Sequence, residues 1–328
     1  MKKVSLFLVL PILTSHLIGQ NNLQEYFSLV KTADSLYNGG DYKNSAFTYS
    51  TAFKSIGWKA YANDRYNAAC SWALAYYPDS SFFHLNRIVT KELYDDYGHI
   101  STDPDLKSLY NDSRWKTLLE LVKKNKDKAE IKLNKSLVKQ LDSIYTEDQK
   151  YRLQINEIEK KYGIKSAEMQ VQWKIIKAKD SINLAKVKAI LDEYGWLGSD
   201  IVGKQGNTTL FLVVQHSDQK TQEKYLPLMR EAVKKGKALG SSLALLEDRV
   251  ALGQGKRQIY GSQITRDIET KLYYVRPLDD PDNVDKRRAE VGLPPLADYV
   301  NYWQIKWDLE KYKKNLPAIE AKEKATRK

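Results

Sequence analysis

The segment LNKSLVKQLDSIY, residues 133–145, decides how the chain is expected to fold. Its apolar side chains recur at intervals of three and four residues, the spacing that places them on one face of an α-helix. These apolar positions are Leu133, Leu137, Leu141, Ile144 and Tyr145. A similar period returns between Trp173 and Leu191, after an interruption at Gly163. Residues 126–194 are therefore expected to form two long helices.

The two helices are expected to pack against each other as a hairpin. A coiled coil is the competing interpretation, but the apolar pattern drifts away from a strict seven-residue repeat. Gly195 follows the last periodic turn of the second helix, where a left-handed backbone is easiest for glycine. The second helix is therefore expected to end at this glycine.

Beyond Gly195 the residue composition and the expected secondary structure change. Glycines at 198, 203 and 206 predict a loop. Residues 208–214 fit either a short helix or a buried strand, because periodicity cannot separate the two over so short a run. Further along the chain we expect helices at 219–237 and 242–252, short extended segments at 258–264 and 271–275, and a last helix after Asp298.

Residues 22–125 carry the signals of paired helices. The stretch LYNGGDY, residues 36–42, and the small and aromatic residues after it resemble the tetratricopeptide repeat. The stretch YNAACSWAL, residues 66–74, is similar to a degenerate terminal repeat. One interpretation is a peptide-binding groove, lined by Tyr37, Tyr49, Phe53 and Trp72. The other is a packing platform, which is favoured because two repeats are too few to bury their own apolar faces. Cys70 is expected to be a small core residue.

The first twenty residues resemble a secretory signal peptide. Lys2 and Lys3 precede an apolar run from Val4 to Leu13, which is too short for the roughly 30 Å core of a bilayer. Cleavage is expected near Gly19 or Gln20, and the mature protein is expected in the periplasm or outside the cell. No later segment predicts a membrane span.

Charge and composition exclude several classes of protein. The chain has 328 residues, with 53 Lys+Arg against 41 Asp+Glu. The excess lysines are interleaved with acidic and apolar residues at helical spacing, which is typical of a solvated helix face and does not indicate nucleic-acid binding. One cysteine and four scattered histidines argue against a disulfide framework or a metal centre, and no cofactor is expected.

An ordered series of motifs spans about residues 130–300. The motifs, with their first residues, are DQxxR at Asp148, DxxN at Asp180, GW at Gly195, QHxD at Gln215, LxDR at Leu246, QxYGxQ at Gln258 and VDxxR at Val284. This pattern resembles an uncharacterised bacterial domain of unknown function. The resemblance implies no activity, so the chemistry must be inferred from residue types.

His216 is the leading candidate for a catalytic residue. A histidine near neutral pH is a ready proton shuttle, and a carboxylate can fix its tautomer. Asp218, which lies within one turn of it, and Asp248 are the other two catalytic candidates. A buried histidine satisfied by the protein itself is the alternative.

Five residues are candidates for ligand binding. Asp248 and Arg249 interrupt an apolar helix, and buried charges of this kind need partners. Arginine suits a carboxylate or phosphate ligand, which makes Arg152 and Arg249 candidate anion-binding residues. Gln258, Tyr260 and Gln263 offer donors and acceptors for hydroxyls or amides. A structural hydrogen-bond network is the competing explanation for each.

The sequence thus predicts a mainly α fold with repeat-like helix pairs, a long helical hairpin, and a compact mostly helical domain with one small β-hairpin. The expected divisions are 1–20, 21–125, 126–194, 195–300 and a basic tail at 301–328. The favoured function is binding of a small polar or anionic ligand in the C-terminal domain, with hydrolytic chemistry as one form of it. The alternative is a non-enzymatic envelope scaffold that binds a protein partner through its N-terminal helices. Whether the protein is an enzyme stays open.

Overall fold

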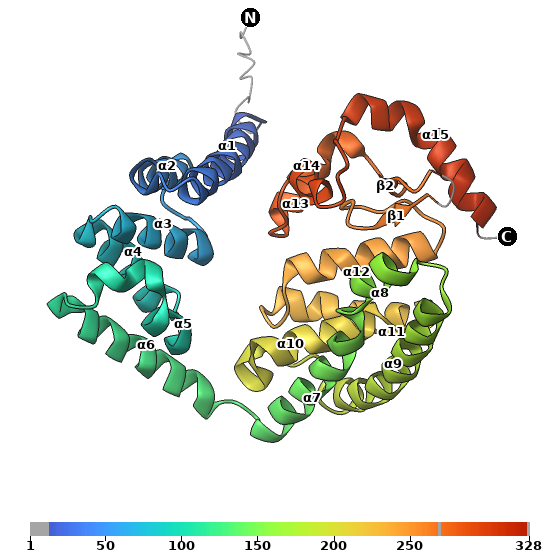
Figure 1. Ribbon diagram of the computed structural model, residues 1–328, viewed down its shortest axis with the longest axis horizontal. Coiled ribbons are helices and arrows are strands. Elements are labelled where there is room, and N and C mark those ends of the chain that lie inside the picture. The colour runs from blue at the N-terminus through green and yellow to red at the C-terminus, as the bar shows by residue number, and fades with distance from the viewer. Residues whose placement is uncertain (1–12, 268–269, 327–328) are drawn as a thin grey trace, which may run out of the picture. The chain divides into compact units, whose positions relative to one another are not determined.

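The computed structural model describes residues 13–267 and 270–326, and the chain divides into two units between Ile131 and Lys132 (Figure 1). Residues 1–12 of the expected signal peptide lie outside the described residues, and Leu13 begins the first helix. None of the described helices has the length and apolar character needed to cross a membrane. The mainly α fold with one small β-hairpin is confirmed for the described residues.

Unit 1 is built from consecutive helices. They are α1 (Leu13–Asn38), α2 (Tyr42–Ser55), α3 (Ala62–Leu74), α4 (Pro78–Lys91), α5 (Tyr97–Thr102), the 3₁₀ helix η1 (Pro104–Leu109) and α6 (Ser113–Ile131). Helix α2 packs against α1 and α3, α3 packs against α4, and α4 packs against α6. The glycine turn between α1 and α2 leads directly into a cap, since the side chain of Asp41 accepts from the backbone N–H of Asn44. Helix α6 extends across residue 125, where the sequence suggested a division.

The aromatic residues expected to line a groove in unit 1 mostly lie in its core. Tyr49, Phe53 and Trp72 are only 1%, 0% and 6% exposed. Apolar rings of this size contribute most when they are removed from water, which is why helix packing takes them inward. Phe53 and Trp72 therefore do not line a groove, whereas Tyr37 and Tyr49 border a polar cavity of this unit. Cys70 is buried in the same unit, as expected of a core residue.

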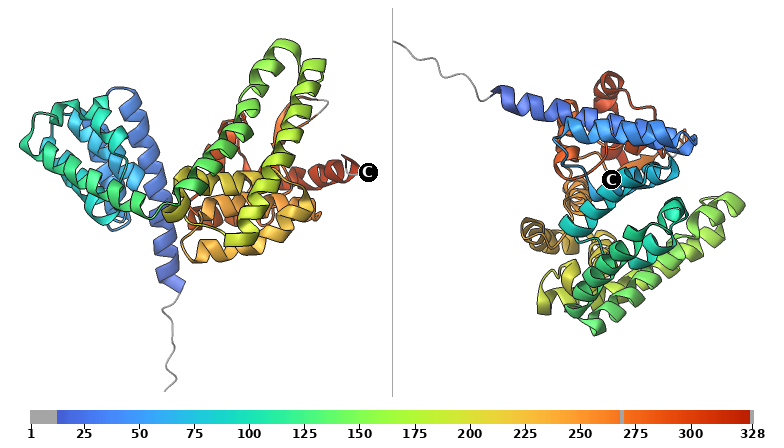
Figure 2. Two further views of the ribbon diagram at one scale, coloured as in Figure 1. Left: turned by 90° about the horizontal axis from the view of Figure 1, so that it is seen from below. Right: turned by 90° about the vertical axis from the view of Figure 1, so that its left-hand side faces the viewer.

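Unit 2 contains the remaining elements. They are α7 (Lys135–Arg152), α8 (Ile155–Tyr162), α9 (Ala167–Tyr194), α10 (Ser199–Gln215), α11 (Gln219–Lys234), α12 (Gly240–Gly253), β1 (Ile264–Arg266), β2 (Tyr273–Val275), the 3₁₀ helix η2 (Pro281–Asn283), α13 (Val284–Glu290), α14 (Leu296–Asn301) and α15 (Leu309–Thr326). Figure 2 (left) shows α7, α8 and α9, coloured green to yellow-green, as a pair of arms projecting from the rest of this unit. Helices α7, α9 and α10 pack against one another.

The predicted hairpin is present, and its ends are set by polar side chains. Asn134 caps α7 by accepting from Leu137 N–H, and Ser166 caps α9 by accepting from Met169 N–H. Helix α9 ends at Gly195, as the sequence predicted. The apolar stripe of α7 is buried in the main core of the unit, with Leu141 fully enclosed. Burying one such leucine stabilises the fold by about 2 kcal/mol.

The expected loop at glycines 198, 203 and 206 is instead the beginning of α10. Gly203 has a positive φ of 72° and kinks the helix, which then continues through the run that was ambiguous between helix and strand. Gly206 explains why the helix can form here. A Cβ atom at this position would lie 3.1 Å from Cδ1 of Leu141, so the missing side chain lets α10 approach α7 closely. This approach sets the position of the C-terminal end of α10.

The extended segment expected at 258–264 is mostly a loop. Strand β1 begins only at Ile264 and pairs in antiparallel register with β2, Ile264 lying opposite Val275. Gly261 has a φ of 71°, which breaks the alternation of an extended strand. The backbone N–H groups around it are also directed at a buried carboxylate, so they are not available to a β-ladder. Residues 258–263 therefore do not form the extended segment that was expected there.

Candidate functional site

A histidine–carboxylate pair lies where α7, α9 and α10 meet. His216 is the residue that ends α10, and its Nδ1 lies 3.0 Å from Oδ1 of Asp148, near the end of α7. The side chain of Asp148 is 2% exposed, whereas that of His216 is 19% exposed. The carboxylate is therefore enclosed by protein while the imidazole ring reaches the surface.

The surroundings of Asp148 keep its carboxylate ionised. Burial alone would raise its pKa, but the hydrogen bond and charge of His216, the charge of Arg152 and the amide of Gln149 together lower it. Gln149 donates at 2.7 Å and Arg152 Nη1 lies 3.2 Å from the carboxylate. An ionised carboxylate can only accept, so Nδ1 of His216 carries the hydrogen. In the neutral ring, Nε2 is then the proton acceptor.

Arg152 connects this pair to a second carboxylate. Its Nη2 lies 2.8 Å from both carboxylate oxygens of Asp180 in α9, and its Nη1 also donates to the Asp148 carbonyl at 2.8 Å. Asp148 and Arg152 are four residues apart, which places them on one face of α7. The guanidinium proposed from the sequence as an anion-binding group is thus already bound to two carboxylates of the protein.

A cleft of about 360 Å³ opens beside His216. It is lined by Asp148, Lys177, Asp180, Ser181, Leu184, Val213, His216, Ser217 and Asp218. Lys177 is exposed and brings a cation to the rim, and the hydroxyls of Ser181 and Ser217 add polar groups. Within the described residues, Nε2 of His216 has no hydrogen-bond partner. His216 therefore both lines the cleft and carries a ring nitrogen without a hydrogen-bond partner among the described residues.

Asp218 lies at this cleft but also caps a helix. Its Oδ1 accepts from the Thr221 N–H at 2.8 Å at the start of α11. This backbone hydrogen bond is the main cause of a lowered pKa for its carboxyl group. Asp218 is therefore an ionised acceptor at the edge of the cleft, held in place by the helix that it caps.

Asp248, the other catalytic candidate, lies away from solvent. It is fully buried, and its carboxylate accepts from three backbone N–H groups of the 258–263 loop: Ile259 at 2.6 Å, Tyr260 at 2.8 Å and Ser262 at 2.8 Å. The sequence indicated that a charge in this apolar helix needs partners, and backbone amides supply them. This geometry assigns Asp248 to holding the loop.

Three of the ligand-binding candidates take part in the same network. Arg249 donates from Nη1 to the Gln215 carbonyl at 2.7 Å, and its Nε lies 3.4 Å from Oε1 of Gln263. Gln258 is fully buried and bonds both the N–H and the carbonyl of Gln263. Through Gln215, Arg249 fixes the end of α10 one residue before His216. Arg249, Gln258 and Gln263 are not among the residues that line the cleft.

Tyr260 is directed elsewhere. Its hydroxyl lies 3.4 Å from Oε2 of Glu247, and burial, followed by the Glu247 charge, raises its pKa to about 12. Of the eight residues predicted from the sequence, the cleft itself thus contains His216 and Asp218, and Arg152 bonds to Asp148 and Asp180 of its lining.

Asp148 and Asp180 line the cleft, but they were not predicted from the sequence as site residues. Asp148 and Asp180 enter the sequence analysis only as the first residues of the DQxxR and DxxN motifs. The motifs themselves carried the signal, because DQxxR, DxxN and QHxD all meet at this cleft. Their convergence depends on how α7, α9 and α10 pack, and no spacing along the chain reveals that.

The same residues have the spacing of a metal site. Ligand atoms of Asp148, Asp180 and His216 lie within 4.8 Å of one another. Arg152, however, contacts both carboxylates, and its fixed positive charge repels a metal cation from the position between them. The arrangement fits an oriented histidine better than a metal centre.

Comparison with known proteins places the C-terminal unit in a family. A model for a family of unknown function, DUF6624, matches residues 135–311, which is more than half of the chain and includes every residue of the cleft. No curated protein and no solved structure matches the chain. The chain therefore belongs to the DUF6624 family.

Proposed function

We propose that unit 2 binds a small polar substrate in the cleft and that His216 acts there as a general base in hydrolysis. The observation that carries this proposal is the contact between His216 Nδ1 and the enclosed carboxylate of Asp148, which leaves Nε2 at the cleft. A positioned carboxylate of this kind fixes the tautomer and stabilises the imidazolium that forms when the ring takes a proton.

The chemistry follows from this arrangement. Nε2 of His216 takes a proton from water while the water oxygen bonds to an electrophilic carbonyl carbon or phosphorus of the substrate. The bond to the leaving group then breaks, and the proton on Nε2 passes to that group. Lys177 at the rim suits a substrate with negative charge, because its ammonium is unpaired within the described residues.

The test is a panel of chromogenic esters, amides and phosphate esters assayed with the full chain. His216→Ala should lower turnover by about 10² to 10⁴-fold, the usual contribution of general-base catalysis. Asp148→Asn should also lower turnover, because the ring loses its ionised partner. Glu231→Gln, on the exposed face of α11, is the matched control and should match the parent.

The outcome depends on the fold of the variants being intact. Circular dichroism and thermal melting should show that His216→Ala remains folded. Equal turnover by the parent and a folded His216→Ala variant would exclude a catalytic role for the imidazole, and the cleft would then be a binding site only.

We also propose export of the protein, as the basic start and the short apolar run of the first twenty residues indicate. Recovery of the mature protein from the cell envelope or medium, with its N-terminus near residue 20, would support this proposal. Recovery of only the unprocessed chain inside the cell would contradict it.

A second candidate function concerns unit 1. We propose that its tetratricopeptide-like helix pairs form a binding unit, as in the scaffold alternative. The observation favouring this proposal is an open, polar cavity of about 630 Å³ that is lined by residues of this unit. Retention of a partner by the parent chain, and its loss when the cavity is altered, would support this function.

A further inference from the structure

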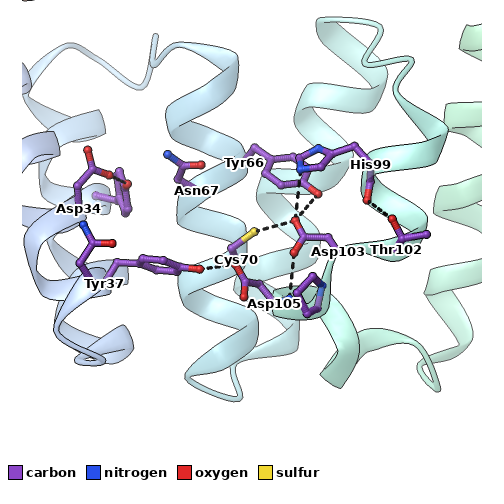
Figure 3. A pocket seen from close by; sticks show the side chains of 12 residues that line it. Asp34, Tyr37, Tyr66, Asn67, Cys70, His99, Thr102, Asp103 and Asp105 are labelled. Carbon is purple, nitrogen blue, oxygen red and sulfur yellow. Dashed lines mark hydrogen bonds and ion pairs between the residues drawn. The ribbon is translucent and has the colours of Figure 1, made fainter. Parts of the chain in front are cut away.

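The residues that line the cavity of unit 1 form an unusual combination. The cavity is lined by Asp34, Tyr37, Asn38, Tyr49, Tyr66, Asn67, Cys70, His99, Thr102, Asp103, Pro104 and Asp105. Three of these residues are aspartates, three are tyrosines, and none is a lysine or arginine. Figure 3 shows the Cys70 thiol and the Tyr66 hydroxyl both directed at Asp103, with Tyr37 reaching Asp105. The cavity is therefore acidic, and its acidic groups are organised by phenols.

The tyrosines support the aspartates without neutralising them. Tyr49 donates its hydroxyl to Asp34, Tyr37 to Asp105 and Tyr66 to Asp103. Burial, then the adjacent carboxylates, raise the pKa of all three phenols, so they stay protonated and donate at neutral pH. Each phenol oxygen keeps lone pairs that can accept from a ligand N–H.

Asp103 is an enclosed carboxylate of this cavity that has no lysine or arginine partner among the described residues. Its side chain is only 9% exposed. Its carboxylate receives the Tyr66 hydroxyl at 2.8 Å, the Cys70 thiol at 3.8 Å and the Asp105 N–H at 3.0 Å, all of them neutral donors. The nearest titratable nitrogen is Nε2 of the exposed His99, at 3.7 Å. Among the described residues no lysine or arginine pairs with it, so its charge is stabilised by neutral donors and by the exposed His99 alone, and a permanent cation would stabilise this enclosed carboxylate further.

We infer that this cavity is a binding site for an organic cation, a primary ammonium or a guanidinium. Such a group would bring a permanent positive charge and several N–H donors to the carboxylate and phenol oxygens. The inference rests on the proposal that unit 1 is a binding unit and is independent of the chemistry proposed for His216. The cation could belong to a free amine or to a lysine or arginine side chain of a peptide.

A metal ion is the less suitable occupant. Ligand atoms of Cys70, Asp103 and Asp105 do lie within 4.8 Å of one another. Burial, then the two aspartates, keep the pKa of the Cys70 thiol well above its usual value, and only a thiolate is a good metal ligand. The cavity is also far larger than one ion needs, since a single water occupies about 30 Å³. An alkyl chain ending in a cation fills such a space better.

The test is isothermal titration of the full chain with N-acetyl-lysine methylamide, butylamine and butylguanidine. N-acetyl-norleucine methylamide, which lacks the charge, is the neutral comparison. The cations should bind and the neutral compound should not, and added salt should weaken binding. Tighter binding of the lysine derivative than of butylamine would indicate a peptide side chain as the natural ligand, and the reverse order a free amine. Both orders support a cation site.

Variants separate this site from the rest of the protein. Asp105→Asn keeps an acceptor for Tyr37 and should weaken cation binding at least about tenfold, as expected when an enclosed charge pair loses one charge. Asp127→Asn removes one exposed aspartate of the same unit outside the cavity and should change binding less than about twofold. His216→Ala should leave cation binding unchanged, so failure of the general-base proposal would not affect this result.

Three results would overturn the inference. One is the absence of any heat of binding when the full chain is titrated with each of the three cations. Another is equal binding of the neutral norleucine derivative. The third is binding of Zn²⁺ or Ca²⁺ alone that depends on Asp103 and Asp105 and excludes the amines. Thermal melting of Asp105→Asn confirms that loss of binding is measured on a folded protein.

Discussion

Arg152 joins α7 to α9: its Nη2 lies 2.8 Å from both carboxylate oxygens of Asp180. The other terminal nitrogen of the same guanidinium reaches Asp148, which holds the ring of His216. The orientation of the imidazole therefore depends on a chain of contacts through three helices. This relationship explains why motifs that are far apart in the sequence act on one cleft.

Replacement of Arg152 should show that its forked shape is required. Arg152→Ala leaves the enclosed Asp148 without its cation and should lower the free energy of unfolding by about 3 kcal/mol. Arg152→Lys restores a charge but cannot contact two carboxylates in the same way, so it should recover only part of the loss. Denaturant unfolding of both variants measures this difference. Full recovery by lysine would mean that charge alone is needed.

Asp148 should make the stability of unit 2 sensitive to acid. Its pKa is lowered in the folded protein, so the unfolded chain takes up the proton first as the pH falls. The stabilisation is present above the unfolded value of about 4 and is lost as the pH falls through the lower folded value. The Asp148→Asn variant should be less stable at pH 7, and the gap from the parent should shrink toward pH 2.

Hydrogen exchange of the α7 amides at several pH values is a suitable measurement, because it reports on unit 2 separately from unit 1. A constant gap between parent and Asp148→Asn over the whole range would show that the carboxylate has the same proton affinity in both states. The contacts of Arg152 and His216 would then need another explanation.

Asp248 should be essential for the loop at 258–263. Asp248→Ala removes the acceptor of three backbone N–H groups and should destabilise unit 2 by roughly 3 to 5 kcal/mol. The Ile259, Tyr260 and Ser262 amides should exchange much faster with solvent in this variant. Slow exchange of these amides in a folded variant would contradict the structural role given to this aspartate.

The sequence predicted what depends on local spacing. The apolar period from Leu133 predicted α7, and Gly195 predicted the end of α9, because a helix face and a helix terminus are encoded within a few residues. The pairing of Asp148 with His216 spans 68 positions and depends on the approach of α10 to α7 at Gly206. The close approach of these two helices cannot be inferred from a single sequence.

The errors have a similar origin. Residues 258–264 have the composition of a strand, but tertiary contacts with Asp248 take the N–H groups that a strand would need. The glycines before α10 are typical of a loop, yet Gly206 is required for close helix packing. In both places a contact with a distant element overrides the local preference.

His84 should make unit 1 lose stability in mild acid. Burial, then the charges of Arg65 and Arg87, lower its pKa from 6.5 to about 4. The ring is 2% exposed, packs against Phe53, and has a buried Nδ1 without a partner. Because the unfolded chain binds the proton more readily, stability is complete above about pH 6.5 and falls by roughly 3 kcal/mol toward pH 4. His84→Gln should flatten this pH dependence of the free energy of unfolding in urea. His99→Gln, at an exposed histidine, is the control and should leave it unchanged. An equal pH dependence for the parent and His84→Gln would place the acid sensitivity elsewhere in the unit.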